Sequence, residues 1–396
     1  MQEKQAIIYL DNAATTPLDP KVLEAILPYL KGQYGNASSI HALGQVARAA
    51  VEKARKQVAL FLNCKESEVY FTPSATFSDN LAILGVIRRA QKQGIKPHII
   101  TSKIEHPAVL ETCKALEKEG VEVTYLPVSK DGLVDPLEVQ NKIKENTVLV
   151  SIMLANNEIG TIQPIAEIGE LLREKNQNRE LKIVFHTDAV QGANYLNLDV
   201  EKLGVDLLTL SGHKIYGPKG IGILYVKQGI AIEPIIFGGH QEAGLSPGTE
   251  NVANIVGIGA AIVAISNGKL QIVNIEKLRD KLIDGILKEI PQAFLNGTRE
   301  KRLPNNVNIS FKGVEGEALL ILLDQAGVAV STGSACSSGS LEASHVLTSL
   351  NFGKERAHSA VRFSLGKNTT EEEINKVLEV LPEMVKHLRK ISGFKV

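Results

Sequence analysis

Short apolar stretches and helical stretches alternate between residues 69 and 187, and this alternation restricts the chain to a small set of folds. Five stretches are typical of strands, namely Val69–Phe71, His98–Thr101, Val121–Leu126, Thr147–Met153 and Leu181–Thr187. Helical stretches separate them, near Ala75–Gln93, Pro107–Glu119, Pro136–Glu145 and Pro164–Lys175. Strands joined by long helical crossovers form sheets that helices cover on both faces. The pattern predicts an α/β fold with a mostly parallel sheet.

The chain has 396 residues, which is enough for two domains. The alternating pattern ends after Thr249, where a long helix (Val252–Ser266) begins, and a later strand (Asn306–Phe311) precedes a final helix. This change predicts a second, smaller α+β domain. We place the large domain at residues 16–259 and the small domain at residues 1–15 plus 260–396.

Composition limits the classes of partner. The 44 basic and 44 acidic side chains cancel, so no basic field attracts nucleic acid or an anionic membrane. The longest apolar stretch, Ile255–Ile265, is too short to span a bilayer, and the first residues do not resemble a secretory signal. We therefore expect a soluble, cytoplasmic protein without direct nucleic-acid or membrane partners. The three cysteines form no C-x-x-C pair, which argues against a disulfide framework and a cysteine metal site.

A lysine lies between two apolar stretches, in the sequence Ser211-Gly212-His213-Lys214. Ligands of α/β sheets bind beyond the carboxyl ends of the strands, where we expect this lysine. In an apolar setting an ammonium group is desolvated and its pKa falls, which makes Lys214 a candidate nucleophile. The local pattern leaves two alternatives open, an ordinary turn with Lys214 in water and a degenerate phosphate loop.

Asp188 ends another apolar stretch, where an unpaired carboxylate would be costly to bury. A helix cap or a surface ion pair would satisfy it. A pyridinium nitrogen would also do so, because pyridoxal phosphate enzymes use an aspartate on the ring nitrogen and a lysine such as Lys214. The phosphate of this cofactor requires a helix N-terminus with small donors, and Ser74-Ala75-Thr76 opens a predicted helix. Ser211 and His213 would add side-chain donors.

His106 and Cys336 each allow a structural and a chemical interpretation. His106 precedes Pro107, so it is suited to cap a helix, or alternatively to stack on the cofactor ring or carry a proton. Cys336 has no bulky residue within four positions on either side. Such a segment cannot build a core, so we expect its thiol to be exposed and chemically available. An anion-binding nest is the competing explanation of this segment.

Taken together, these residues resemble those of the cysteine desulfurases in the pyridoxal phosphate-dependent class V aminotransferase family. The resemblance runs nearly end to end, through Tyr9–Thr16, Asn156–Gly160 and Arg362–Gly366. Its most specific motifs are Ser-Gly-His-Lys at 211–214 and Ser-Ala-Cys at 334–336, and the latter is similar to the branch with a long, flexible cysteine loop. The resemblance implies an aminotransferase-type fold, as a homodimer with a site at the subunit boundary.

The resemblance also implies catalytic and ring-binding roles. The implied catalytic residues are Lys214, which carries the cofactor on its amine, His106, which stacks on the ring, and Cys336. Asp188 would pair with the ring nitrogen. The residues implied to contact the side of the ring are Asn157 and Gln191.

Phosphate and substrate contacts follow from the same resemblance. The residues implied to bind the phosphate are Ala75, Thr76, Ser211, Gly212 and His213, with Thr249 of the partner subunit. Arg362, with Asn157 beside it, would bind the substrate carboxylate, because a guanidinium does this bidentately. No resident metal is expected, although Cys336 is a candidate transient iron–sulfur ligand.

The implied reaction converts L-cysteine to L-alanine and captures the sulfur as a persulfide on Cys336. The sulfur would then pass to an iron–sulfur scaffold or to a sulfur-relay protein for tRNA thiolation. Two alternatives stay open, a selenocysteine lyase or related C–S lyase, and a low-activity paralogue that acts as a regulatory partner. Phe77, Ala243 and Ser246 motivate the latter, because they stand where family members commonly carry a glutamate and two arginines.

Overall fold

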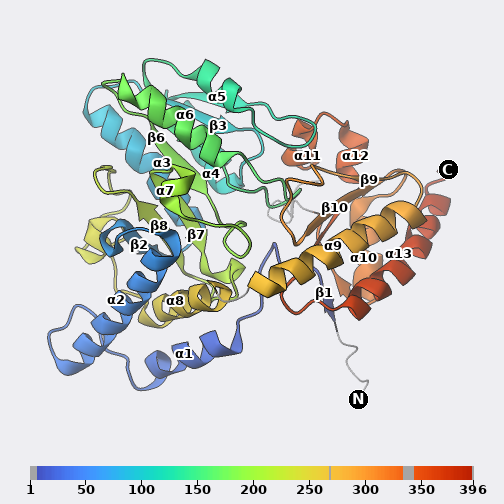
Figure 1. Ribbon diagram of the computed structural model, residues 1–396, viewed down its shortest axis with the longest axis horizontal. Helices are drawn as coiled ribbons and strands as arrows, with labels where there is room; N and C mark the ends of the chain where they lie inside the picture. The colour runs from blue at the N-terminus through green and yellow to red at the C-terminus, as the bar shows by residue number, and fades with distance from the viewer. Residues whose placement is uncertain (1–6, 267–268, 333–342, 395–396) are drawn as a thin grey trace.

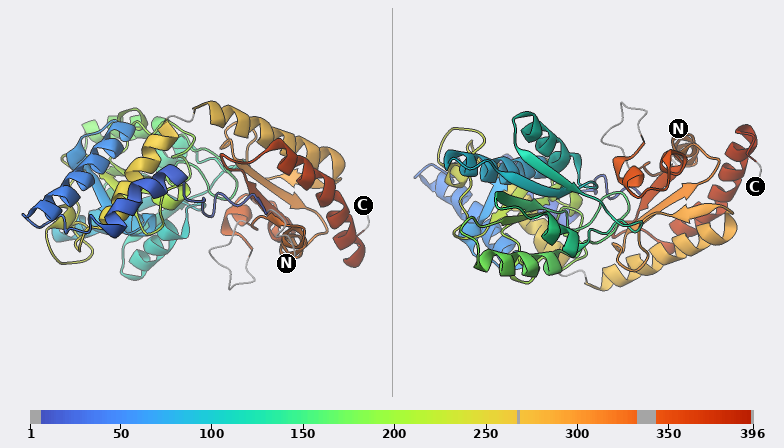
Figure 2. Two further views of the ribbon diagram at one scale, coloured as in Figure 1. Left: turned by 90° about the horizontal axis from the view of Figure 1, so that it is seen from below. Right: turned by 90° about the horizontal axis from the view of Figure 1, so that it is seen from above.

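The computed structural model describes residues 7–266, 269–332 and 343–394, which form two bodies that lie side by side (Figures 1 and 2). The larger body contains a seven-stranded sheet in the order β2-β8-β7-β6-β5-β3-β4. Its strands are β2 (Val69–Thr72), β3 (His98–Ser102), β4 (Glu122–Leu126), β5 (Thr147–Ser151), β6 (Val184–Asp188), β7 (Leu207–Ser211) and β8 (Gly222–Val226). The pairings from β4 to β7 are parallel, and those of β8 with β7 and β2 are antiparallel. The predicted mostly parallel sheet is confirmed.

Helices cover the larger sheet, and most begin at a residue that caps them. They are α1 (Pro20–Lys31), α2 (Ala42–Leu62), α3 (Ala75–Lys92), α4 (Pro107–Lys118), α5 (Pro136–Lys142), α6 (Ile165–Gln177), α7 (Val200–Leu203) and α8 (Val252–Ser266), with short 3-10 turns η1 (Glu66–Glu68), η2 (Gly212–Lys214) and η3 (Gln241–Gly244). Asp19, for example, accepts a hydrogen bond from the Lys21 N–H at 2.8 Å and precedes a proline at the first helical position. These starts match the helices that the sequence predicts.

The smaller body combines a three-stranded antiparallel sheet, in the order β12-β10-β9, with helices. Its elements are β9 (Ala293–Leu295), β10 (Asn306–Phe311), β12 (Ala360–Ser364), α9 (Lys269–Glu289), α10 (Gly316–Gln325), α11 (His345–Ser349), α12 (Lys354–His358) and α13 (Glu371–Ile391). The N-terminal strand β1 (Ile8–Tyr9) pairs in parallel with β11 (Val328–Ala329). The start of the chain therefore folds back onto this body, and Leu10 lies in its core.

Each body has its own apolar core, and the buried residues of helix α8 belong to the larger one. Gly259 lies within α8, and Ala261 and Ile262 beyond it still belong to the core that contains α2 and the large sheet. A Cβ atom at Gly259 would lie 2.9 Å from the Cβ of Ala54, so the glycine permits close packing of α8 on α2. The division into domains stays a prediction, and this packing leads us to propose the boundary after α8. None of the described helices is long and apolar enough to cross a membrane.

Candidate active site

A cavity of about 550 Å³ lies beyond the carboxyl ends of the central strands, and residues of both bodies line it. It brings together ten of the residues that the sequence singled out, namely Ala75, Thr76, His106, Asn157, Asp188, Gln191, Ser211, His213, Lys214 and Arg362. Gly212 lies in the turn between two of these but does not line the cavity. Cys336 lies outside the described residues. Thr249 is exposed in the loop between η3 and α8 and does not line the cavity.

The N-terminus of α3 opens into this cavity. Ser74 caps the helix by accepting a hydrogen bond from the Phe77 N–H at 3.1 Å, and Ala75 and Thr76 form the first turn. The backbone N–H groups and dipole at the start of an 18-residue helix attract anions. A Cβ atom at Gly222 would lie 2.8 Å from the Ala75 nitrogen, so strand β8 approaches this turn as closely as it does because residue 222 is glycine.

Lys214 is held by the N-terminal segment of the chain. Its Nζ donates hydrogen bonds to the carbonyl oxygens of Ala13 and Ala14, both at 2.6 Å. Its own carbonyl accepts a hydrogen bond from Asn194 Nδ2 at 2.7 Å, which fixes the backbone of turn η2. These contacts hold the amine at the cavity wall. The neighbouring His213 hydrogen-bonds Thr15 Oγ1 through Nδ1 at 3.1 Å.

Asp188 ends strand β6 and is buried at the cavity wall. Its Oδ1 accepts a hydrogen bond from the Val190 N–H at 2.9 Å. Burial raises the pKa of this carboxyl above its ordinary value, while the basic side chain of His106, the Val190 N–H and the amine of Lys214 oppose that rise. The carboxylate is therefore directed toward a cavity in which a cationic group would stabilise it.

His106 caps α4 and also lines the cavity. Its Nδ1 accepts a hydrogen bond from the Ala108 N–H at 3.1 Å, so the structural interpretation of this residue is correct. Burial lowers the pKa of the imidazole, Asp188 opposes this, and Lys214 and His345 lower the pKa further. His106 caps the helix and lines the cavity at the same time, so the cap does not exclude a chemical role.

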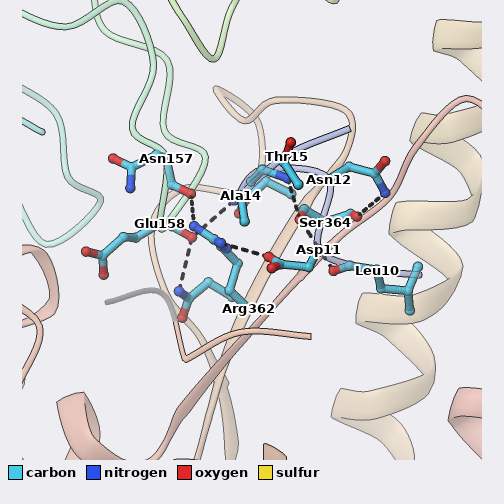
Figure 3. Close-up of polar contacts among 12 residues, drawn as sticks. Leu10, Asp11, Asn12, Ala14, Thr15, Asn157, Glu158, Arg362 and Ser364 are labelled. Atoms are coloured by element: carbon cyan, nitrogen blue, oxygen red, sulfur yellow. Dashed lines mark hydrogen bonds and ion pairs between the residues drawn. The ribbon is translucent and has the colours of Figure 1, made fainter. Parts of the chain in front are cut away.

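Arg362 lies on strand β12 of the smaller body and lines the cavity. Figure 3 shows its polar contacts. One of its terminal nitrogens donates to the Asn157 carbonyl oxygen at 2.9 Å, and the other pairs with Asp11 Oδ1 at 2.9 Å. The side chain is nearly fully buried, and its Nε has no hydrogen-bond partner within the described part of the chain. A buried guanidinium with an unused N–H has capacity left for a ligand.

Several residues at this site were not predicted from the sequence. The N-terminal segment binds Lys214 and Arg362 at once, through the carbonyls of Ala13 and Ala14 and the carboxylate of Asp11. Further residues of this kind that line the cavity are Asp79, Met153, Ala155 and Lys219. Residues 9–16 are part of the sequence that resembles the family, but the sequence pattern assigns them no role at the site.

Phe77 lies on helix α3, Ala243 lies in turn η3, and Ser246 follows that turn. Phe77 is partly buried and packs against a core cluster under α3. Ala243 has a left-handed backbone in η3, next to Glu242, whose carboxylate pairs with Arg55 at 2.8 Å. This ion pair attaches the loop that carries Thr249 to helix α2.

Comparisons with known proteins agree on one family. The model of the class-V aminotransferase family matches residues 8–377. The cysteine desulfurase IscS of Dictyoglomus turgidum is 50% identical over 389 residues, which cover 98% of this chain and 97% of that protein. The cysteine desulfurase IscS of Methanosarcina thermophila is 50% identical over 387 residues, which cover 97% and 93% of the two chains. The chain belongs to the cysteine desulfurases of the class-V aminotransferases.

Solved structures with related sequences have the same fold. A NifS-like protein superposes with a TM-score of 0.89 at 39% identity, covering 96% of this chain and all of the other. SspA in complex with cysteine superposes with a TM-score of 0.80 at 36% identity, covering 92% of this chain and all of the other. The predicted family and the predicted aminotransferase-type fold are confirmed.

Proposed function

We propose that the chain is a pyridoxal phosphate-dependent cysteine desulfurase that converts L-cysteine to L-alanine and captures the sulfur on Cys336. One observation carries the proposal: Lys214, Asp188 and Arg362, far apart in the sequence, line a single cavity. An amine, a carboxylate and a guanidinium are the groups required for the cofactor aldehyde, the ring nitrogen and the substrate carboxylate. The 50% identity to curated cysteine desulfurases supports it.

The residues present fit pyridoxal phosphate. Lys214 would bind its aldehyde, Asp188 its ring nitrogen, and the N-terminus of α3, with Ser211 and His213, its phosphate. Burial, with the charges of Lys214 and Lys219, lowers the pKa of His213 to about 4. Its imidazole is therefore neutral near pH 7 and would contact the phosphate as an uncharged group. When bound, the cofactor withdraws electrons from the α-carbon of the substrate. His106, Asn157 and Gln191 would contact the ring.

The chain's own residues would orient L-cysteine and move its protons. Arg362 binds the α-carboxylate through the N–H capacity that its contacts with Asn157 and Asp11 leave over. The amine of Lys214 takes the α-proton. His106 accepts the Ala108 N–H through Nδ1, so its neutral imidazole, whose pKa burial lowers, carries its proton on Nε2 and can donate it.

Sulfur transfer would use the thiolate of Cys336, which lies outside the described residues. The thiolate attacks the sulfur of the bound substrate, so that an S–S bond forms while the substrate C–S bond breaks. The electron pair of the broken bond stays with carbon, which takes a proton, and L-alanine leaves. The enzyme sulfur thereby becomes a persulfide, available to an acceptor.

We further propose a homodimer in which Thr249 of the partner subunit completes the phosphate site. Thr249 is exposed and does not line the cavity of its own chain, which supports this arrangement. An iron–sulfur scaffold or a sulfur-relay protein would receive the persulfide sulfur. A cytoplasmic location stays a prediction.

The experiment that tests the function is alanine formation from L-cysteine by the purified, cofactor-loaded protein. Cys336→Ser should keep the visible absorption of the cofactor but form no persulfide. Cys64→Ser is the matched control, because burial raises the pKa of the Cys64 thiol to about 12 and so keeps it unreactive. Sulfide release by Cys336→Ser at the wild-type rate with dithiothreitol would refute the assignment.

A further inference from the structure

A second carboxyl group lies at the cavity wall beside Asp188. Asp79 lies on α3, one turn after the helix start that we assign to the phosphate, and it lines the cavity. Its side chain is only 1% exposed, and its Oδ1 makes no hydrogen bond within the described residues. A buried carboxyl oxygen without a partner is costly, so this residue requires an explanation. The proposed mechanism gives it no task.

The surroundings of Asp79 come from three neighbouring strands. The imidazole of His186 on β6 lies within ion-pair distance, with Nε2 at 3.5 Å from Asp79 Oδ1. The same imidazole is held by two hydroxyl groups, Ser151 Oγ on β5 at 2.9 Å from Nδ1 and Thr209 Oγ1 on β7 at 3.2 Å from Nε2. Because His186 and Asp188 lie two positions apart on one strand, both side chains point to the face that α3 covers.

The groups that surround Asp79 and Asp188 differ in charge. Burial raises the pKa of Asp79 well above its ordinary value, and the negative charges of Asp188 and Glu105 raise it further, against a hydrogen bond from Thr209. Burial lowers the pKa of His186 to about 3, so this imidazole is neutral and supplies no charge. Burial raises the pKa of Asp188 as well, but the basic groups of His106 and Lys214 and the Val190 N–H oppose that rise. The two carboxyls are both buried, and only Asp188 has basic groups among its neighbours that favour its charged form.

We propose that Asp79 is a positioning residue for the ring-nitrogen site: as a neutral carboxylic acid next to His186, it supplies a hydrogen-bond donor beside Asp188 and leaves a single negative charge at this wall. The proposal rests on the proposed function, because it assigns the wall to the cofactor ring. A neutral carboxylic acid can donate a hydrogen bond through its O–H, whereas an ionised carboxylate can only accept one. The ring nitrogen would therefore meet a single carboxylate, that of Asp188.

Infrared spectroscopy tests the protonation of Asp79 in the cofactor-free protein. We expect the carbonyl stretch of a protonated carboxylic acid to be stronger in the wild-type protein than in Asp79→Asn at pH 7. The difference should shift on transfer to heavy water. Identical spectra of the two proteins in this region would overturn the proposal. This measurement needs no bound cofactor, so it stays informative even if the protein binds no pyridoxal phosphate and the proposed function fails.

A pair of similarly sized substitutions tests the role of the donor. Asp79→Asn keeps a neutral donor, whereas Asp79→Leu removes it. We expect Asn to retain the cofactor dissociation constant within about threefold and to keep the pH midpoint of the cofactor's visible absorption. Leu should weaken binding about tenfold or more and shift that midpoint, because a hydrogen bond beside a charged group is lost. Equilibrium dialysis and absorbance titration measure both quantities.

Two outcomes of this comparison would overturn the proposal. Equal losses in Asn and Leu would mean that the negative charge of Asp79 is required. Equal retention in Asn and Leu would mean that Asp79 only fills space. If Leu fails to fold, as circular dichroism would reveal, the comparison of Asn with the wild-type protein and the infrared difference still decide the question.

Discussion

The two sides of the cavity carry different polar groups. On the side built by the seven-stranded sheet, the protonation of these groups depends on their surroundings. The side built by the smaller body presents a fixed charge. We call the first the sheet wall, formed by Asp79, His106 and Asp188, and the second the arginine wall, formed by Asp11 and Arg362. Burial shifts the pKa of each member of the sheet wall. Arg362 instead pairs with Asp11 at 2.9 Å.

This difference separates two tasks of the site. In the sheet wall, burial raises the pKa of Asp79 and Asp188 and lowers that of His106, so the cavity sets the protonation of these groups. Recognition of a carboxylate requires a charge that persists, and a guanidinium keeps its charge in proteins. The segment of residues 11–14 joins the two walls, since its carbonyls hold Lys214 and its carboxylate holds Arg362.

The largest effect should follow from removal of the amine between the walls. Lys214→Ala should lower alanine formation by roughly a thousandfold or more, because the group that takes the α-proton is lost. Lys219→Ala is the control, since Lys219 also lines the cavity but is exposed. A steady-state assay with L-cysteine measures both variants. A greater loss in Lys219→Ala than in Lys214→Ala would show that Lys214 is not the lysine that takes the α-proton.

The arginine wall should affect substrate binding more than turnover. Arg362→Lys keeps the charge but loses the planar fork, so KM for L-cysteine should rise about 10- to 100-fold with a smaller change in kcat. Asp11→Asn should raise KM less, because the Asn157 carbonyl still orients the guanidinium. Steady-state kinetics over a range of L-cysteine concentrations separates the two constants. A loss confined to kcat would place Arg362 among the proton-transferring groups.

The helix start at the base of the sheet wall should set the affinity for the cofactor. In Gly222→Ala the new Cβ would lie 2.5 Å from the Ser74 carbonyl carbon and 2.8 Å from the Ala75 nitrogen, so α3 must shift. We expect cofactor binding to weaken about tenfold and the free energy of unfolding to fall by about 1–3 kcal/mol. Gly32→Ala is the control, because nothing lies within 4 Å of its added Cβ. Unchanged cofactor affinity in Gly222→Ala would show that the first turn of α3 does not bind the phosphate.

Glu105, behind the sheet wall, should have the smallest effect on activity but a clear effect on the pH dependence of stability. Burial raises its pKa from the ordinary 4.5 to about 8, against hydrogen bonds from Ser102 and the Met153 N–H. Between these pH values the unfolded chain releases a proton that the folded chain retains, so the free energy of unfolding falls as pH rises from about 4.5 to about 8. Glu105→Gln should flatten this decline in urea titrations. An equally steep decline in that variant would show that Glu105 is already ionised in the folded protein.

Much of the fold follows from local sequence, and the site follows from the fold. Because the carboxyl ends of parallel strands meet at one edge of a sheet, the strand pattern alone predicts that Asp188 and Lys214 lie near one another. The contacts of Ala13 and Ala14 could not be predicted, because backbone carbonyls carry no side-chain signal. Asp79 could not be predicted either, because it lies one turn beyond the helix start that the phosphate requires.

The change of pattern after Thr249 predicts a boundary near Gly259, and this division stays a prediction. Gly259 allows α8 to pack on Ala54 of α2, and such close helix packing has no signal in the local sequence. Thr249 and Cys336 depend on a partner subunit and on a segment outside the described residues, so their predicted roles stay predictions.

The central claim is that the amine of Lys214 and the carboxylate of Asp188 face one bound ring, and location of the cofactor on the chain tests it most directly. The protein loaded with pyridoxal phosphate would be reduced with borohydride, digested and analysed by mass spectrometry. We predict one pyridoxyl adduct, on the peptide that contains Lys214. An adduct on Lys219, or on any lysine outside the cavity, would contradict the account.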